Sequence, residues 1–165
     1  MYVLYKNKVY NTAIGYLQNI EDAEEITQDV FLTIFQKAGT FKGNSKISTW
    51  IYRITINKSL NQIEKRKSRP HSDTEIKDFH KIEFNHPGGI LENQEKLKYL
   101  FAAINTLSKK QKTSFILSYV EGLPRQEVAL IMKTTLKSVE SLLQRAKINL
   151  RKKLISLYPE GITKN

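Results

Sequence analysis

The sequence predicts an all-α protein made of two small helical domains joined by a flexible linker, and three observations support this prediction. Apolar residues recur at helical spacing through most of the 165 residues, while runs that alternate apolar and polar residues are few. The helical period disappears between about residues 66 and 93, a stretch longer than connections inside compact domains usually are. Proline is absent from the first 69 residues, and all four prolines fall where other signals end or begin a helix. We therefore divide the chain into a front domain at residues 1–67, a linker at 68–93 and a rear domain at 94–158.

Charge is the unusual feature of the composition. Twenty-seven Lys and Arg stand against 16 Asp and Glu, a net charge of +11, which favours a polyanionic partner such as nucleic acid or an acidic membrane surface. The chain has no cysteine, which excludes both a disulfide framework and a thiolate zinc site. It also has no run of about 18 apolar residues. We expect a soluble, cytoplasmic protein that does not insert into membranes.

The predicted linker contains "SRPHSDTEIKDFHKIEFNHPGG", which gathers two prolines, two glycines and all three histidines of the chain. The histidines are His71, His80 and His86, and their spacing matches neither a helical face nor a zinc pattern. We interpret them as polar linker residues and expect neither a metal nor a cofactor.

The segment "NIEDAEEITQDVFLTIFQKAG" predicts a helix with Asn19 or Asp22 as its N-cap and Gly39 as its stop. Its apolar stripe consists of Ala23, Ile26, Val30 and Ile34.

Acidic residues form a second stripe on this helix, through Asp22, Glu25 and Asp29. One interpretation is a solvated helix whose early acids complement the positive end of the helix dipole. Asp29 lies two turns into the helix, however, where that compensation has faded and like charges repel. The other interpretation is that a basic protein partner supplies the missing cations.

The segment "STWIYRITI" is rich in β-branched and aromatic residues, a composition typical of a strand. Its continuation, however, places Tyr52, Ile56, Leu60 and Ile63 at helical spacing, which predicts a helix over residues 48–66. The predicted inward face consists of Tyr52, Ile56, Ser59, Leu60 and Ile63. The opposite face carries Trp50, Arg53, Ile54, Asn57, Lys58, Asn61 and Lys65.

A face that mixes an aromatic ring with amides and cations suits nucleic acid. Arg and Lys neutralise phosphates, Asn contacts base edges, and an aromatic ring gives unpaired bases a stacking surface. The loop "FKGNSKIS" precedes the helix and is of a kind that wraps a displaced group. The alternative is that Trp50 packs inside, against the acidic helix or the amino-terminal helix.

The rear domain predicts four helices, of which the last two form a helix-turn-helix. Ser108 is expected to cap the second helix, and Pro124 to lie in the first turn of the third. A turn at Lys133 to Thr135 leads to the fourth helix. That helix has a core stripe of Val139, Leu143, Ala146 and Leu150.

The fourth helix presents polar and basic side chains away from its core stripe, as a major-groove helix does. These are Lys137, Ser138, Ser141 and Arg145. An ordinary solvated surface is the alternative. Lys133 occupies a turn position that often holds Gly, where a non-Gly residue in a left-handed conformation costs about 1 to 2 kcal/mol.

An acidic helix, a basic helix, a long linker and a basic helix-turn-helix, in this order, resemble the extracytoplasmic-function class of bacterial sigma factors, in the sigma-70 family. "DAEEITQDVF" is similar to the core-binding segment of region two, and "STWIYRITINKSLNQIEKRK" to its promoter-melting, minus-ten segment. "EGLPRQEVALIMKTTLKSVESLLQRAKINLRKKL" is similar to region four, which reads the minus-thirty-five element. The resemblance covers nearly the whole chain and implies a region-two helical bundle in front of a region-four helix-turn-helix domain.

The resemblance implies a partner for each of these surfaces. The coiled-coil clamp helices of the β′ subunit of core RNA polymerase would face Asp22, Glu25, Gln28 and Asp29, and the β subunit would be a further contact. The minus-ten strand of promoter DNA would meet Phe41, Asn44, Ser45, Trp50, Arg53, Asn57, Lys58, Asn61 and Lys65. The minus-thirty-five duplex would meet Arg125, Lys137, Ser138, Ser141, Arg145 and Lys147. An inhibitory anti-sigma protein is a further partner common in the family.

The chain departs from the usual family pattern at Glu140, where many members have a basic residue, and at Leu142, where many have Arg. These departures bear on base-specific contacts and not on phosphate contacts.

Two other functions are alternatives. A stand-alone helix-turn-helix regulator with an unrelated front domain leaves the acidic stripe and the Trp50 face unexplained, and such regulators usually dimerise on paired half-sites. An enzyme acting on nucleic acid would need a phosphate-binding loop, metal ligands or an activated nucleophile, and no such pattern is present. We therefore expect no catalytic residues.

Overall fold

The computed structural model describes residues 1–68 and 94–159, here called the front half and the rear half, and within them every regular element is a helix. This confirms the predicted all-α class. The expected linker falls almost wholly outside the described residues, as do the three histidines.

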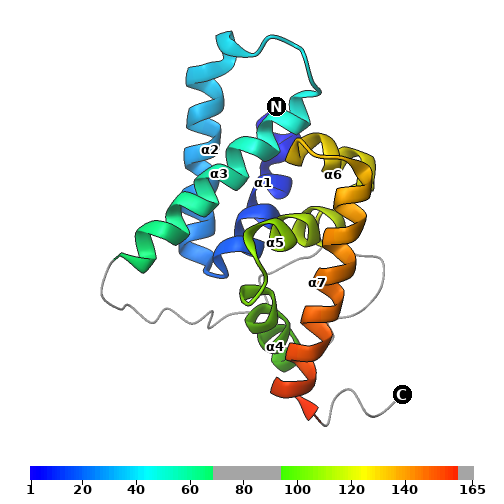
Figure 1. Ribbon diagram of the computed structural model, residues 1–165. Coiled ribbons are helices and arrows are strands. Elements are labelled where there is room, and N and C mark those ends of the chain that lie inside the picture. Colours follow the sequence, from blue (N-terminus) through cyan, green and yellow to red (C-terminus); the bar gives the residue numbers. More distant parts are fainter. Residues whose placement is uncertain (69–93, 160–165) are drawn as a thin grey trace.

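The front half is a bundle of three long helices (Figure 1). They are α1 (Tyr2–Leu17), α2 (Ile20–Lys37) and α3 (Ile47–Lys67), with a short 3-10 turn, η1 (Ala38–Thr40), after α2. The Asn19 side chain caps α2 by accepting a 2.8 Å hydrogen bond from the Asp22 amide, so the first of the two expected caps is the correct one. The expected stripe of Ala23, Ile26, Val30 and Ile34 is buried.

The rear half has the four helical elements that the sequence predicts, the second of which ends in a turn of π-helix. They are α4 (Gln94–Asn105), α5 (Lys109–Phe115) continued by η3 (Ile116–Val120), α6 (Arg125–Met132) and α7 (Leu136–Leu157). Ser108 caps α5 as expected. Pro124 lies immediately before α6 rather than inside its first turn. At this N-cap position its carbonyl accepts a hydrogen bond from the helix.

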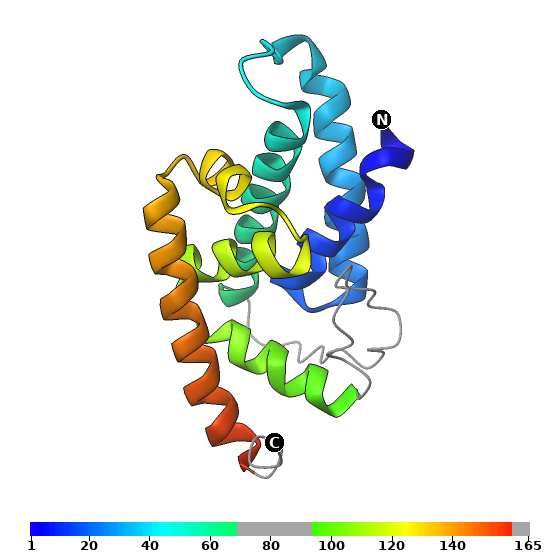
Figure 2. The same cartoon turned by 90° about the vertical axis from the view of Figure 1, so that its right-hand side faces the viewer.

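The two halves pack against each other (Figures 1 and 2). Their buried apolar residues belong to one hydrophobic core. The π-turn η3 lies on α1, and α6 lies on α3. A Cβ atom built on Gly15 of α1 would lie 3.3 Å from Ile116 Cγ2, so the helix and the π-turn approach each other closely at this point.

Helix α3 is therefore buried on two sides. Ile51, Thr55 and Ser59 are buried on the side from which Arg66 reaches the carboxylate of Asp22 on α2. Ile56, also buried, instead faces the rear half. The sequence correctly places Ile56 on a buried face, but the surface that covers it belongs to the other half of the molecule.

Candidate nucleic-acid and protein interfaces

The acidic stripe of α2 borders α3, which neutralises part of it. Arg66 pairs with Asp22, and Lys58 Nζ lies 3.8 Å from Asp29 Oδ2. Glu25 and Gln28 are exposed, and Glu25 makes no ion pair among the described residues. Cations from the chain itself thus compensate two of the acids, while the outer part of the stripe remains open.

Two exposed apolar residues continue this stripe toward the end of α2. Leu32 follows Gln28 and Phe35 follows Leu32 at helical spacing, and their exposed fractions are 55% and 83%. Exposed apolar residues that adjoin one another often mark a contact surface. Sequence reasoning missed them, although their spacing from Glu25 and Gln28 was a readable signal.

An aromatic pair stands where the loop after η1 meets α3. The Phe41 and Trp50 rings have centroids 5.4 Å apart, and both side chains are half-buried. Asn44 is exposed and Ser45 half-buried in the loop between them, where Gly43 has a φ of 70°. The Trp50 side chain was expected either to face DNA or to pack inside. It does part of each, because one part packs on the core and the other part is exposed to solvent.

The remaining residues of the predicted minus-ten face divide into two groups. Asn61 and Lys65 are exposed on the outer side of α3, and Lys58 is turned toward Asp29. Arg53 and Asn57 lie on the flank that faces the rear half, where both line a cavity. The predicted face is thus only partly open.

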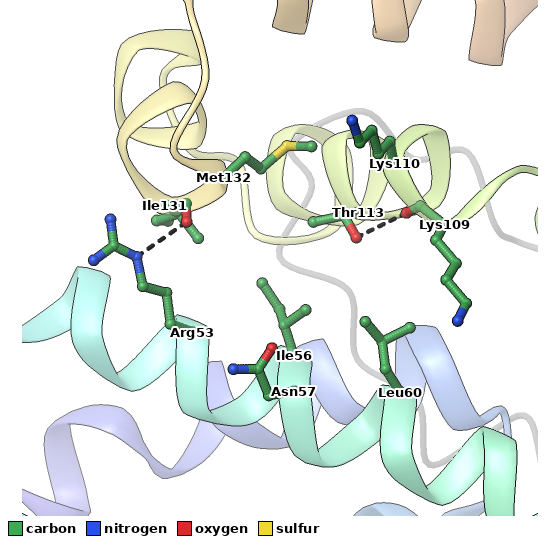
Figure 3. A pocket seen from close by; sticks show the side chains of 9 residues that line it. All are labelled: Arg53, Ile56, Asn57, Leu60, Lys109, Lys110, Thr113, Ile131 and Met132. Carbon is green, nitrogen blue, oxygen red and sulfur yellow. Dashed lines mark hydrogen bonds between the residues drawn. The ribbon is translucent and has the colours of Figure 1, made fainter.

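Figure 3 shows the cavity on this flank, which has a volume of about 250 Å³. Its apolar lining comes from Ile56 and Leu60 of α3 and from Ile131 and Met132 of α6, and three cations border it. The cations are Arg53, Lys109 and Lys110.

The helix-turn-helix forms as predicted. Lys133 ends α6 in the left-handed region with a φ of 52°, and the Thr135 hydroxyl caps α7 by accepting from the Ser138 amide at 3.1 Å. All four residues of the expected α7 core stripe are buried, and Leu142 is buried beside them. Leu142, the position that departs from the family pattern, is therefore buried and does not offer its side chain to DNA.

The residues predicted for the minus-thirty-five duplex do not all point outward. Lys137 and Arg145 are exposed, and Ser138 and Ser141 are half-buried along the same side of α7. Arg125 Nη1 lies 3.5 Å from Glu140 Oε1. Glu140, the other departure from the family pattern, therefore pairs with Arg125, which is a predicted DNA contact. Lys147 Nζ lies 5.1 Å from the centre of the Tyr119 ring and is thereby held to one side.

Two buried ionisable groups lie where the halves meet. Burial lowers the pKa of Lys112 to about 8, with a smaller contribution from the charge of Lys67. Burial raises the pKa of Glu121 to about 7, against the opposing effects of a hydrogen bond from Tyr52 and the charge of Lys8.

Family models match both halves of the chain. Sigma-70 region 2 matches residues 1–69, and the region 4 model of the same family matches residues 97–150. The chain belongs to the sigma-70 family, in its extracytoplasmic-function class. As a sigma factor it directs RNA polymerase to promoters.

Curated relatives align over most of this sigma factor. The RNA polymerase sigma-H factor of Pseudomonas aeruginosa is 27% identical over 95% of this chain and 86% of its own length. The extracytoplasmic-function sigma factor SigW of Bacillus subtilis is 27% identical over 93% of this chain and 87% of its own length.

Two solved structures share the fold. The sigma factor RpoE of Bartonella quintana, crystallised with the anti-sigma factor NepR, has a TM-score of 0.68 at 21% identity and covers 93% of both chains. CnrH in complex with the cytosolic domain of CnrY has a TM-score of 0.70 at 16% identity and covers 94% of this chain and 85% of that one. Among the residues described for this sigma factor, no helix has the length and apolar character needed to cross a membrane.

Proposed function

We propose that this sigma factor holds core polymerase through α2, captures the minus-ten strand with α3 and its preceding loop, and binds the minus-thirty-five duplex with α7. The observation that carries the proposal is the order of one acidic segment, on α2, and two basic segments, on α3 and α7, along a chain that both sigma-70 models match.

Polymerase binding uses the open part of the acidic stripe, Glu25 and Gln28, together with Asp22 and Asp29. The partner surface is the basic coiled coil of the β′ clamp, and its cations exchange with Lys58 and Arg66, which neutralise two of the acids in the free protein. Leu32 and Phe35 extend this contact with apolar area. The β subunit makes a second contact with the bound sigma factor.

Strand capture uses the aromatic pair and the amides around it. A base that leaves the duplex loses stacking, at a cost of a few kcal/mol, and a pocket that receives it offsets part of that cost. The base is received beside the Phe41 and Trp50 rings, within reach of Asn44 and Ser45 of the loop between them. Asn61 and Lys65 lie farther along α3 and hold the strand by amide and phosphate contacts.

Duplex binding uses α7 in the major groove, with Arg145 and Lys137 on phosphates and the two half-buried serines toward the bases. Each DNA contact is weak alone, and the tether between them raises their combined affinity when the spacing fits. The protein itself catalyses no reaction, since polymerase makes the RNA. It acts in the cytoplasm, where its partners are, and an anti-sigma protein restrains it there.

Run-off transcription tests this function. Purified core polymerase is mixed with genomic fragments of the host, with and without this sigma factor. Transcripts with defined start sites are expected only when the protein is present. A stand-alone regulator would instead bind duplex operator tightly without polymerase and leave the pattern of start sites unchanged.

A further inference from the structure

The cavity of Figure 3 has apolar walls from two helices that are distant in the sequence. Ile56 and Leu60 point from α3 toward the rear half, and Ile131 and Met132 belong to the end of α6. Ile56 and Ile131 are buried, while Leu60 and Met132 are half-buried, so the walls are shielded but in contact with solvent. An apolar group that displaces poorly held water from such walls gains free energy.

The polar lining of the cavity is neutral or basic. Of the nine residues that line it, three are cations and none is an acid. Arg53, one of the cations, donates from Nη2 to the Leu130 carbonyl at 2.6 Å and from Nε to the Ile131 carbonyl at 3.1 Å. Because carbonyls do not neutralise a guanidinium, Arg53 contributes positive potential to the cavity although most of its donors are engaged.

Two further side chains of the lining offer donors that the protein does not use. Lys110 is exposed and makes no ion pair or side-chain hydrogen bond among residues 1–68 and 94–159. The exposed amide of Asn57 likewise makes no side-chain hydrogen bond within these ranges. Lys109, the third cation, differs, because its Nζ lies 2.9 Å from Glu64 Oε1. The cavity therefore presents an uncompensated ammonium group and an amide beside its apolar walls.

The volume of the cavity limits its ligand to a small molecule. An apolar cavity of about 150 Å³ accepts benzene, and sites for drug-sized ligands hold about 300 to 1,000 Å³. The cavity of about 250 Å³ lies between these values. It has room for one aromatic ring or a branched aliphatic chain, with a charged substituent toward Lys110.

We propose that this cavity is a binding site for a small amphipathic anion, a carboxylate or phosphate ester whose body is one aromatic ring or a branched aliphatic chain. The body packs against Ile56, Leu60 and Met132, and the anionic group accepts hydrogen bonds from Lys110 and Asn57. Apolar walls alone would also admit neutral compounds, and cations alone would admit inorganic anions, so the two together define the ligand class. The inference does not rest on the proposed function, because it concerns the free protein and a small molecule.

The methionines of the chain provide a direct test. The sequence has only two, Met132 in the lining of the cavity and Met1, which is 57% exposed and does not line it. Methionine labelled with ¹³C in its methyl group therefore gives one NMR signal from the site and one from an internal control. The signal that disappears in the Met132→Leu protein identifies which is which.

The probes are para-ethylbenzoate, its neutral counterpart para-ethylbenzamide, which has nearly the same shape, and inorganic phosphate. With para-ethylbenzoate the Met132 signal should shift and saturate with a Kd of about 1 mM or lower, while the Met1 signal stays in place. The amide should bind about fivefold more weakly or worse, because its ammonium contact is uncharged on one side. Phosphate should leave the Met132 signal unchanged. An unmoved Met132 signal, equal affinities for benzoate and benzamide, or equal shifts of both methionines would overturn the proposal.

Two variants locate the binding. Lys110→Glu should weaken binding of para-ethylbenzoate by about fivefold or more and leave that of para-ethylbenzamide nearly unchanged. Lys152→Glu makes the same change of charge at an exposed position of α7 that does not line the cavity, and it should bind both probes as the parent does. Equal losses in the two variants would mean that the probe responds to the net charge of the protein, and the proposed site would be wrong.

Leu60→Trp tests the apolar part of the site, because the larger side chain occupies the cavity. Both organic probes should then lose their binding. Circular dichroism and a single sharp Met132 signal check that this variant is folded. A folded Leu60→Trp protein that binds para-ethylbenzoate as tightly as the parent would exclude the cavity as the binding site.

Discussion

The Tyr52 hydroxyl of α3 donates a 2.8 Å hydrogen bond to Glu121 Oε2, which joins the two halves through a carboxyl buried between them. The other oxygen, Oε1, is buried and has no hydrogen-bond partner among the described residues. Burial is the main reason why the pKa of Glu121 rises to about 7. The charge of Lys8 on α1 acts in the opposite direction. In an open molecule, in which the two halves have separated, we expect the carboxyl of Glu121 to have a pKa near its ordinary value of 4.5.

This difference in the pKa of Glu121 predicts that packing of the two halves against each other, the docked arrangement, weakens as the pH rises from about 5 to 7.5. Below the open-state pKa both states hold the proton, so the carboxyl does not disfavour docking. Above the docked-state pKa, docking requires burial of a charge, at a cost of at most about 3 kcal/mol. The radius of gyration from small-angle scattering should increase over this interval. Lys112, whose docked-state pKa is about 8, stays charged through most of it.

Glu121→Gln is the matched control for this prediction. The amide keeps the shape of the side chain and its acceptor for Tyr52 but does not ionise, so the variant should remain docked at pH 7.5. The three histidines of the sequence are unchanged in this variant, so any effect of theirs is common to both proteins. If the variant expands with pH as the parent does, Glu121 is not the source of the effect.

Asp29→Arg is expected to abolish binding to core polymerase while the fold survives. Asp29 is half-exposed and its pair with Lys58 is long at 3.8 Å, so the loss should lower the free energy of unfolding by at most about 1 kcal/mol. The new cation would, however, repel a basic clamp surface. Size-exclusion chromatography with core enzyme should show no joint peak, and circular dichroism should show an unchanged helix content.

The control for this charge reversal is Glu24→Arg on the same helix. Glu24 is exposed, and its charge adds to burial in raising the pKa of the Tyr10 hydroxyl, which places Glu24 toward α1 and away from Asp29. This variant should still bind polymerase. Equal binding by parent and Asp29→Arg proteins would remove the clamp assignment from α2.

Arg145→Ala should weaken binding to duplex DNA and make its salt dependence shallower. Arg145 is exposed on α7, and removing one phosphate-binding cation reduces the slope of log affinity against log salt by about 0.9. Arg151→Ala removes the same charge from the same helix at a position outside the proposed DNA-binding surface. Equal losses of affinity in the two variants would mean that charge alone is measured and that Arg145 makes no specific contact.

Local features of the sequence were sufficient to predict the helices. The cap at Asn19, the left-handed Lys133 and the α7 core stripe all depend on residues within a few positions of each other. The helical repeat also predicted that the acidic residues of α2 form one stripe.

Relations between distant residues were not predictable in this way. The sequence predicted that Ile56 lies on an inward face of α3, but a helical wheel shows only that a face is apolar and not which surface covers it. Arg53 was expected on an open face, yet its carbonyl acceptors are 77 and 78 positions away in the chain. A second helix packed on α3 changes which cations are free, and no local pattern records such a contact.

Ser59→Ala is expected to stabilise the protein. The Ser59 side chain is fully buried on α3, and its hydroxyl has no hydrogen-bond partner among the described residues. Its removal relieves a desolvation cost and improves helix propensity, so the free energy of unfolding should rise by up to about 1 kcal/mol. Ser114→Ala is the contrast, since the Ser114 hydroxyl donates to the Gln111 carbonyl at 2.9 Å. Urea unfolding should shift to higher concentration for the first variant only.

Lys133→Gly should also stabilise the protein, through the backbone rather than through a contact. Lys133 has a φ of 52° and a ψ of 49° at the end of α6, a conformation that glycine adopts without the Cβ clash of other residues. The gain should be about 1 kcal/mol and appear as a higher melting temperature. Lys133→Ala removes the same charge but keeps the Cβ, so it should give no such gain. If the two variants have the same melting temperature, removal of the Lys133 charge, and not relief of backbone strain, explains the change.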